Sequence, residues 1–401
     1  MTRIAAFLCF LLIACSEDAP TVDPATMSWE QIEQAAHGST VSMLTWTGDP
    51  QINRYMQGWV VPMLKEKHGI DLKLASVAGP RIVAFILAER ETGKHVSEAD
   101  LVWMAGRTSR GLREINALMG GLDGLPNYAN VDAANPFIAF DYDIPINGFQ
   151  VPWGQGQFML ITDQARVNNP PRSMAELEAW VRQNPGRFTL DAGFTTLGFL
   201  KALMVELAGG RDAFGPRFNE ALYNELAPQL WAYLNRIRPY MWRNGEAFAR
   251  SPAQMHQMFA SGEIDFTMSY NDGETDAKIA SGLFTDTSYG YVWRSGTPRN
   301  AHYLGVVANG ANRAGAMVVA NFLISQEAQL EKLRAGSWGD NTILNMDRLP
   351  PDVRQRFQIE GTRQHAPSLA SVEDAAFREL HPDYIDRLYE DFLQKIVRGG
   401  S

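Results

Sequence analysis

Cysteine is nearly absent from this chain. Its 401 residues include only two cysteines, Cys9 and Cys15, and both lie close to the N-terminus. If the N-terminal segment is removed and Cys15 is modified, the remaining chain carries no free thiol. Disulfide frameworks, metal sites with cysteine ligands and cysteine nucleophiles are then excluded for the mature protein.

Common catalytic signatures are missing as well. The sequence has no G-x-S-x-G, G-x-x-x-x-G-K-[ST] or H-E-x-x-H motif. Its seven histidines are scattered, and no two have the spacing of metal ligands. Gly154-Gln155-Gly156 lacks the rest of a dinucleotide-binding fingerprint. We therefore expect no enzyme activity, no metal site and no cofactor, although two carboxylates distant in sequence could still form a glycosidase-type pair.

Long apolar runs are also missing, apart from a short one at the N-terminus. An apolar stretch follows Arg3 and covers residues 4–14, which is shorter than the roughly 20 residues that cross a bilayer. Leu12-Ile13-Ala14-Cys15 resembles a bacterial lipobox, in which the cysteine becomes the first mature residue and carries lipid. We predict a signal peptide over 1–14 and a lipidated Cys15 with a flexible tether over 15–39. The alternative is an ordinary signal peptide with an incidental cysteine.

The charge of the chain is modest. Its formal net charge is −9, and this becomes −10 when Arg3 leaves with the signal peptide. Such mild acidity argues against binding to nucleic acid or to an anionic membrane face. About 385 of the 401 residues then remain, which is more than one hydrophobic core usually holds, so we expect two lobes.

Strand-like and helical segments alternate along the chain. The runs 40–46, 70–77 and 99–106 have the pattern of strands, and helical patterns follow them. A second unit of this kind begins near residue 170, and an amphipathic helical stripe covers 384–397. The alternation predicts an α/β fold in which each lobe is a mixed, mostly parallel sheet flanked by helices.

A stretch in the last third of the chain carries a family resemblance. WRSGTPRNAHYLGVVANGANRAGAMVVANFLISQEAQ (293–329) resembles the type II periplasmic solute-binding proteins of bacterial ABC importers. LTWTGDPQINRYM, VPWGQGQFMLITD and GEIDFTMSYNDGE match the same family at the expected places, and GSWGDNTILNMDRLP (336–350) is similar to its YnjB-type branch. The resemblance covers roughly residues 40–350 and is specific only as a set.

The resemblance implies two lobes that are joined by crossing strands and close on a solute. It places residues 40–148 and 300–338 in the first lobe, and residues 152–295 and 345–401 in the second. The hinges are then expected near 149–160, 290–302 and 338–345. In open α/β sheets, ligands bind outside the carboxyl ends of the strands, and pockets favour domain interfaces.

That rule selects candidate ligand-binding residues directly after the expected strands and on the crossing strands. Both lobes present aromatic side chains beside a few polar groups, which suits a cleft for a small solute. Each candidate also has a structural alternative: the tryptophans could be core residues, Asp49 a helix cap, and Arg294 a salt-bridge partner. The candidates are Trp46, Thr47, Asp49, Asn53, Trp103, Trp153, Gln155, Thr195, Thr196, Tyr270, Asn271, Asp272, Trp293 and Arg294.

The charge of the solute stays open at this stage. Asp49, Asp272 and the aromatic residues suit a cation such as thiamine or a polyamine, whereas Arg107, Arg294 and two helix starts suit an anion.

We expect a solute-binding subunit of an ABC importer, held at the periplasmic side of a membrane by lipid on Cys15 and delivering its solute to permease subunits. It is expected to act as a monomer. The alternative is a membrane-tethered sensor or scaffold that uses the same fold without transport.

Overall fold

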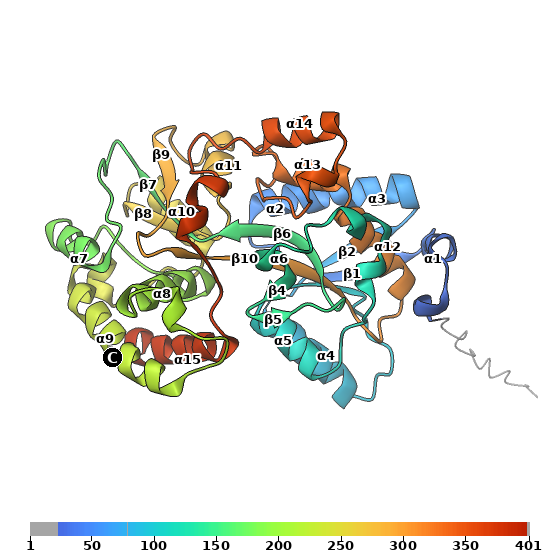
Figure 1. Cartoon of the computed structure of the whole chain (residues 1–401), viewed down its shortest axis with the longest axis horizontal. Coiled ribbons are helices and arrows are strands. Elements are labelled where there is room, and N and C mark those ends of the chain that lie inside the picture. The colour runs from blue at the N-terminus through green and yellow to red at the C-terminus, as the bar shows by residue number, and fades with distance from the viewer. Residues whose placement is uncertain (1–22, 78, 399–401) are drawn as a thin grey trace, which may run out of the picture.

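Two hydrophobic cores organise the molecule. A computed structural model describes residues 23–77 and 79–398 (Figure 1). One core collects buried side chains from residues 32–153 and 301–357, and we call this part lobe 1. The other collects those from 158–293 and 377–396 together with Tyr142, and we call it lobe 2. The predicted signal peptide and lipidated Cys15 lie outside the described residues.

Lobe 1 is built on a six-stranded mixed sheet. Its order is β11-β10-β3-β1-β2, with β6 paired to β10. β1 runs parallel to β2 and β3, whereas β10 runs antiparallel to β3 and β6. The bounds are β1 Thr40–Thr45, β2 Asp71–Ser76, β3 Leu101–Met104, β6 Val151–Gln157, β10 Thr297–Val306 and β11 Ala376–Arg378; a small hairpin adds β4 Phe140–Asp141 and β5 Ile144–Pro145.

Lobe 2 contains a smaller sheet in the order β8-β7-β9. The strands are β7 Met159–Asp163, β8 Phe266–Ser269 and β9 Ser288–Tyr291. Both neighbours of β7 run antiparallel to it, so the expectation of a mostly parallel sheet is wrong for this lobe. The chain around Thr189, which also has a strand-like sequence, contributes only an isolated bridge between Asp191 and Ala249.

Helices cover both sheets. Lobe 1 has α1 Trp29–Ala36, α2 Pro50–Tyr55, α3 Val61–His68, α4 Pro80–Glu91, α5 Arg107–Glu114, α6 Pro136–Ala139, α12 Arg313–Leu323, α13 Gln326–Leu333 and α14 Pro351–Glu360. Lobe 2 has α7 Met174–Gln183, α8 Phe194–Leu207, α9 Glu220–Ile237, α10 Pro252–Ala260, α11 Glu274–Ala280 and α15 Pro382–Phe392. Short 3₁₀ helices lie at Pro24–Thr26, Leu122–Gly124, Pro126–Asn130, Arg211–Ala213, Arg238–Tyr240, Trp242–Gly245, Met346–Arg348 and Ala370–Ala375, and π-helical turns at Met56–Val60 and Leu393–Val397.

The first helix after β1 begins as the sequence predicts. The Asp49 carboxylate accepts hydrogen bonds from the amides of Gln51 and Ile52, and Pro50 occupies the first helical position. A π-helical turn joins α2 to α3, which ends at Gly69 in the left-handed conformation. This cap places Asp49 at the edge of lobe 1 that faces lobe 2.

Three segments cross between the lobes. β6 and β10 run side by side across the middle of the molecule (Figure 1), and the third crossing follows α14. There the Arg363 guanidinium donates to the carbonyl of Gly339 in lobe 1, while the His365 carbonyl accepts from the amide of Gly290 in lobe 2.

The third crossing therefore differs from the expected hinge near 338–345. Ile343, Leu344 and Phe357 belong to the lobe 1 core. Residues 345–360, expected in lobe 2, thus pack on lobe 1. The core of lobe 2 resumes at Phe377 of β11, a strand that pairs with β10.

The expected tether also ends earlier than predicted. Within residues 15–39, helix α1 begins after a capping box formed by Ser28 and Gln31. It packs against α12, and Ile32 and Ala36 are part of the lobe 1 core.

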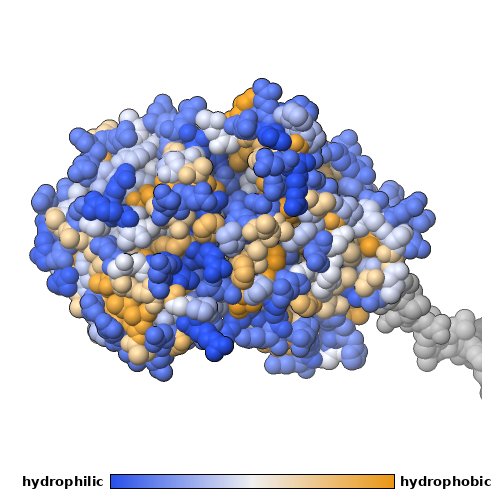
Figure 2. Space-filling view, in the orientation of Figure 1, coloured by the Kyte–Doolittle hydropathy of each residue, from blue (hydrophilic) through white to orange (hydrophobic). Residues whose placement is uncertain are grey.

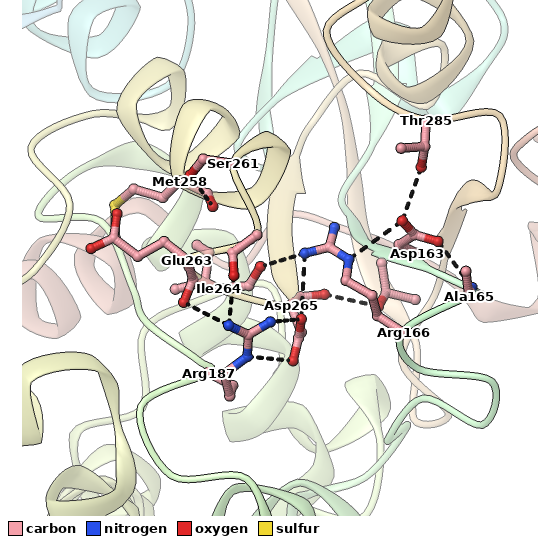
Figure 3. A network of polar contacts seen from close by, with 12 residues as sticks. Asp163, Ala165, Arg166, Arg187, Met258, Ser261, Glu263, Ile264, Asp265 and Thr285 are labelled. Atoms are coloured by element: carbon pink, nitrogen blue, oxygen red, sulfur yellow. Dashed lines mark hydrogen bonds and ion pairs between the residues drawn. The ribbon is translucent and has the colours of Figure 1, made fainter.

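A charged network braces the sheet of lobe 2 (Figure 3). Arg187 donates two hydrogen bonds to the Asp265 carboxylate, at 2.8 and 2.5 Å. Arg166 donates to the carbonyl of Ile264 at 2.9 Å and forms an ion pair with Asp163. The network joins the end of β7 to the start of β8 and leaves the opposite ends of these strands free to face lobe 1.

The surface in Figure 2 is mostly hydrophilic, with hydrophobic residues in scattered patches. None of the helices in residues 23–77 and 79–398 has the length and apolarity needed to cross a membrane.

Candidate functional site

A cavity of about 550 Å³ lies between the lobes. Lobe 1 contributes Trp46, Asp49, Gln51, Trp103, Arg107, His302, Trp338 and Asp340 to its wall. Lobe 2 contributes Asp191, Gly193, Thr195, Arg250, His256, Tyr270, Asn271 and Glu274. The candidates that the structure brings together here are Trp46, Asp49, Trp103, Thr195, Tyr270 and Asn271, along with Arg107.

The wall from lobe 1 is aromatic and rigidly held. Trp103 lies 6.5 Å from Trp46, measured between ring centroids, and its indole N–H donates to Nδ1 of His302 at 2.9 Å. Because an indole nitrogen can only donate, Nδ1 must accept, and the proton of neutral His302 then resides on Nε2. That Nε2–H points to the Asp340 carboxylate at 3.0 Å, and Asp340 also forms a buried ion pair with Lys332.

Burial decides the protonation state of His302. It lowers the pKa of His302 below its usual value, and this outweighs the opposite effect of Asp340. His302 is therefore neutral at pH 7, and it orients the ring of Trp103 without adding charge to the cavity.

The wall from lobe 2 carries Tyr270, whose hydroxyl donates to the Glu379 carboxylate at 3.2 Å. The same carboxylate oxygen of Glu379 also accepts a hydrogen bond from the side-chain amide of Asn300 on the crossing strand β10. Glu379 in turn forms a buried ion pair with Lys201. The Lys201 ammonium lies 5.3 Å from the centroid of the Tyr270 ring. Burial raises the pKa of Tyr270 well above its usual value, so its hydroxyl stays protonated.

Polar contacts close the cavity from one lobe to the other. Lys278 of lobe 2 forms ion pairs with Asp49 of lobe 1 at 2.6 Å and with Glu274 of its own helix at 3.0 Å. The side-chain amide of Gln51 donates to the carbonyl of Ala277 at 2.6 Å. Although burial opposes ionisation of Asp49, Lys278 and the capped amides hold its pKa below the usual value. The two lobes are thus pinned together in a closed arrangement.

Asp191 belongs to the cavity wall and was missed in the sequence analysis. Its Oδ1 accepts hydrogen bonds from the hydroxyl of Thr195 at 2.6 Å and from the amide and hydroxyl of Thr196, both at 2.8 Å. It directly follows the strand-like run from Phe188 to Leu190, so the rule applied to the other strands could have selected it.

Four of the candidates lie away from the cavity on or near lobe 1 and the crossing strand. Trp153 is fully buried in the core behind Trp103, with ring centroids 5.3 Å apart. The Gln155 amide donates to the carbonyl of Thr342. The Thr47 hydroxyl donates to the hydroxyl of Ser76 at the end of β2, and the Asn53 amide donates to the Thr47 carbonyl.

The other four lie in lobe 2. Trp293 is fully buried and donates to Glu206. Arg294 is exposed and pairs with Glu176 at 2.6 Å, the salt-bridge role considered as its alternative. Thr196 is buried behind Asp191, and Asp272 is buried beside Asn341 and Arg363. None of these eight side chains lines the cavity.

Comparison with known proteins identifies the family. Residues 59–341 match the family model of the bacterial extracellular solute-binding proteins. The chain is also 33% identical to Protein YnjB of Escherichia coli (strain K12) over 375 residues, which cover 92% of this chain and 93% of that protein. This chain belongs to the bacterial extracellular solute-binding proteins. The family binds solutes and performs no chemistry on them, so the predicted class of function is confirmed.

Solved structures confirm the fold of this solute-binding protein. A putative spermidine/putrescine ABC transporter from Listeria monocytogenes superposes with a TM-score of 0.61 at 13% identity, covering 88% of this chain and 98% of that one. A periplasmic thiamin binding protein superposes with a TM-score of 0.59 at 17% identity, covering 90% and 96%. At such low identity the likeness concerns the fold alone, and the contents of the cavity have to be argued from its own side chains.

Proposed function

We propose that this protein is the solute-binding subunit of an ABC importer and captures one small solute in the cavity between its lobes. The observation that carries the proposal is that aromatic and polar side chains of both lobes line a single cavity. A solute that contacts both walls binds the closed form more tightly than the open one and so shifts the population toward closure. The closed form is then presented to a membrane permease.

Within this proposal, the residues that contact the solute are Trp46, Asp49, Trp103, Thr195, Tyr270 and Asn271. The eight candidates that lie off the cavity wall are left out of the site. The proposal keeps Cys15 as the lipid attachment point, on the evidence of the lipobox alone, with the binding protein at the periplasmic side of a membrane. No feature of the described residues favours the sensor or scaffold alternative.

A thermal-shift screen of the full-length protein in mild detergent tests this function. A solute at 100 times its Kd stabilises the folded state by about 2.7 kcal/mol, which is readily seen as a rise in Tm. For a solute found in this way, we expect Tyr270→Ala to weaken binding at least tenfold in calorimetry. Arg294→Ala, which changes a candidate residue off the cavity, serves as the control and should keep the wild-type Kd. Equal affinity of both variants would contradict the site.

The anchor has its own test. Cys15→Ala should move the protein from the membrane fraction to the soluble fraction of the producing cells, while a wild-type distribution would contradict lipidation.

A further inference from the structure

Asp191 carries a carboxylate oxygen to which no residue in the described part of the chain donates a hydrogen bond. The side chain is fully buried, and Oδ1 takes all three hydrogen bonds from Thr195 and Thr196. Oδ2 is buried and has no hydrogen-bond partner among the described residues. Burying a charged oxygen without a partner is strongly unfavourable, so such a group calls for a donor that is supplied from outside the chain.

The cavity reaches the residues around that oxygen. Asp191 and Gly193 both line it. A Cβ atom on Gly193 would lie 2.9 Å from Oδ2, so the missing side chain leaves space beside this oxygen.

The buried lysines that contact acids of the cavity wall are already paired with those acids. Lys278 is shared by Asp49 and Glu274, at 2.6 and 3.0 Å. Lys332 is paired with Asp340 in a buried contact. Both lysines are therefore balanced by acids other than Asp191.

Three further groups on the cavity wall carry or can acquire a positive charge: His256, Arg107 and Arg250. Burial lowers the pKa of His256, whose Nδ1 lies 2.7 Å from the Thr267 hydroxyl, so this histidine is neutral at pH 7. Arg107 forms an ion pair with Asp386 at 2.5 Å. Arg250 is exposed, so water solvates its charge without any help from a ligand. The desolvated charge of the wall is thus negative.

We propose that the solute is an organic cation and that Oδ2 of Asp191 accepts a hydrogen bond from its positively charged nitrogen group. This inference rests on the proposed capture of a small solute. The aromatic faces of Trp46, Trp103 and Tyr270 fit the same chemistry, because a cation is attracted to the face of an aromatic ring. The side-chain nitrogen of Asn271, which is buried and has no hydrogen-bond partner within residues 23–77 and 79–398, supplies a donor for an acceptor atom on the same molecule.

The test compares probes that differ in charge. Benzamidine, benzamide and benzoate share a ring and are cationic, neutral and anionic at pH 7; spermidine and thiamine extend the cations, and glucose 6-phosphate extends the anions. Each is titrated into the full-length protein in detergent, with Tm and calorimetric Kd as the readouts. We expect saturable binding by at least one cation, and binding at least tenfold weaker by its neutral or anionic counterpart.

Asp191→Asn tests the residue itself. The asparagine can keep the acceptor that Thr195 and Thr196 use but lacks the charge, so we expect cation binding at least tenfold weaker and an unchanged or higher Tm without solute. Asp286→Asn, at an exposed aspartate of the same lobe, is the control and should keep the wild-type Kd. The inference is overturned if Asp191→Asn binds the cations with unchanged affinity, or if the wild-type protein binds the anions more tightly than the cations. Either result leaves solute capture intact. If no probe of either charge binds, the proposed capture fails and the inference fails with it.

Discussion

At the scale of single residues, the walls of the cavity are rings oriented by buried polar partners. Trp103 is held by His302 and Tyr270 by Glu379, each from a distant part of the chain. These partners orient the two rings but add no net charge to the cavity wall, because His302 is neutral and the charge of Glu379 is balanced by Lys201.

The first prediction concerns His302. Replacing it by glutamine removes a buried link between Trp103 and Asp340, which should lower the stability by about 1–3 kcal/mol at pH 7.5. Because the pKa of His302 is lowered in the folded state, the unfolded chain binds a proton more readily than the folded one. The contribution of His302 to the free energy of unfolding is therefore present above the pKa that this histidine has in the unfolded chain. It is lost as the pH falls below about 6.5.

Thermal melts between pH 8 and pH 5.5 check this sign. The gap in Tm between wild type and His302→Gln should narrow as the pH falls. His95→Gln, at an exposed histidine, is the control, and its gap should stay small and constant. A His302→Gln gap that widens toward pH 5.5 would show that the assigned protonation state is wrong.

At the scale of elements, the crossing strand β6 depends on two glycines. A Cβ atom on Gly154 would lie 1.9 Å from Oδ2 of Asp340, and one on Gly156 would lie 1.9 Å from the Tyr270 carbonyl oxygen. The Gly-Gln-Gly sequence is thus explained by close packing at the crossing, where the strand passes the cavity wall.

The second prediction follows from that contact. Gly156→Ala should destabilise the protein by about 1–3 kcal/mol, because a backbone carbonyl cannot move aside as a flexible side chain can. Gly124→Ala is the matched control, since a Cβ atom there meets nothing within 4 Å. Chemical denaturation measures both, and equal stability of the two variants would refute the role of close packing.

At the scale of the whole molecule, Lys278 forms a buried ion pair between the two lobes. This lysine is 4% exposed and joins Asp49 of one lobe to Glu274 of the other. Removing one partner of a buried ion pair costs about 3–5 kcal/mol, because the remaining charge is left uncompensated. Here two carboxylates would remain, so their repulsion would open the lobes.

The third prediction is that Lys278→Gln shifts the solute-free protein toward the open form. Small-angle X-ray scattering should report a larger radius of gyration than for wild type, and Kd for the solute should rise at least tenfold. Arg294→Gln, which breaks an exposed pair within lobe 2, should change neither quantity, because such pairs contribute 0–1 kcal/mol. If Lys278→Gln gives the same scattering curve as wild type, Lys278 does not hold the two lobes together.

Local sequence signals predicted many elements well. The strands β1, β2 and β3 and the helix that starts at Asp49 follow from apolar periodicity and cap residues, which act over a few neighbouring positions. The rule that ligands bind near strand ends also selected Trp46, Trp103 and Tyr270, and these three residues line the cavity. Trp293 and Arg294 do not line the cavity, because they lie between β9 and β10 rather than on a crossing strand and contact Glu206 and Glu176 of lobe 2.

The sequence by itself determined the two-lobed α/β fold and the family, because apolar periodicity and short motifs involve residues that are close together in the chain. Only the tertiary structure decided which candidates line the cavity, which lobe receives residues 345–360, and that Oδ2 of Asp191 has no hydrogen-bond partner among the described residues. Those outcomes depend on contacts between residues that are far apart in the chain, and burial then sets the cost of each charge left without a counter-ion.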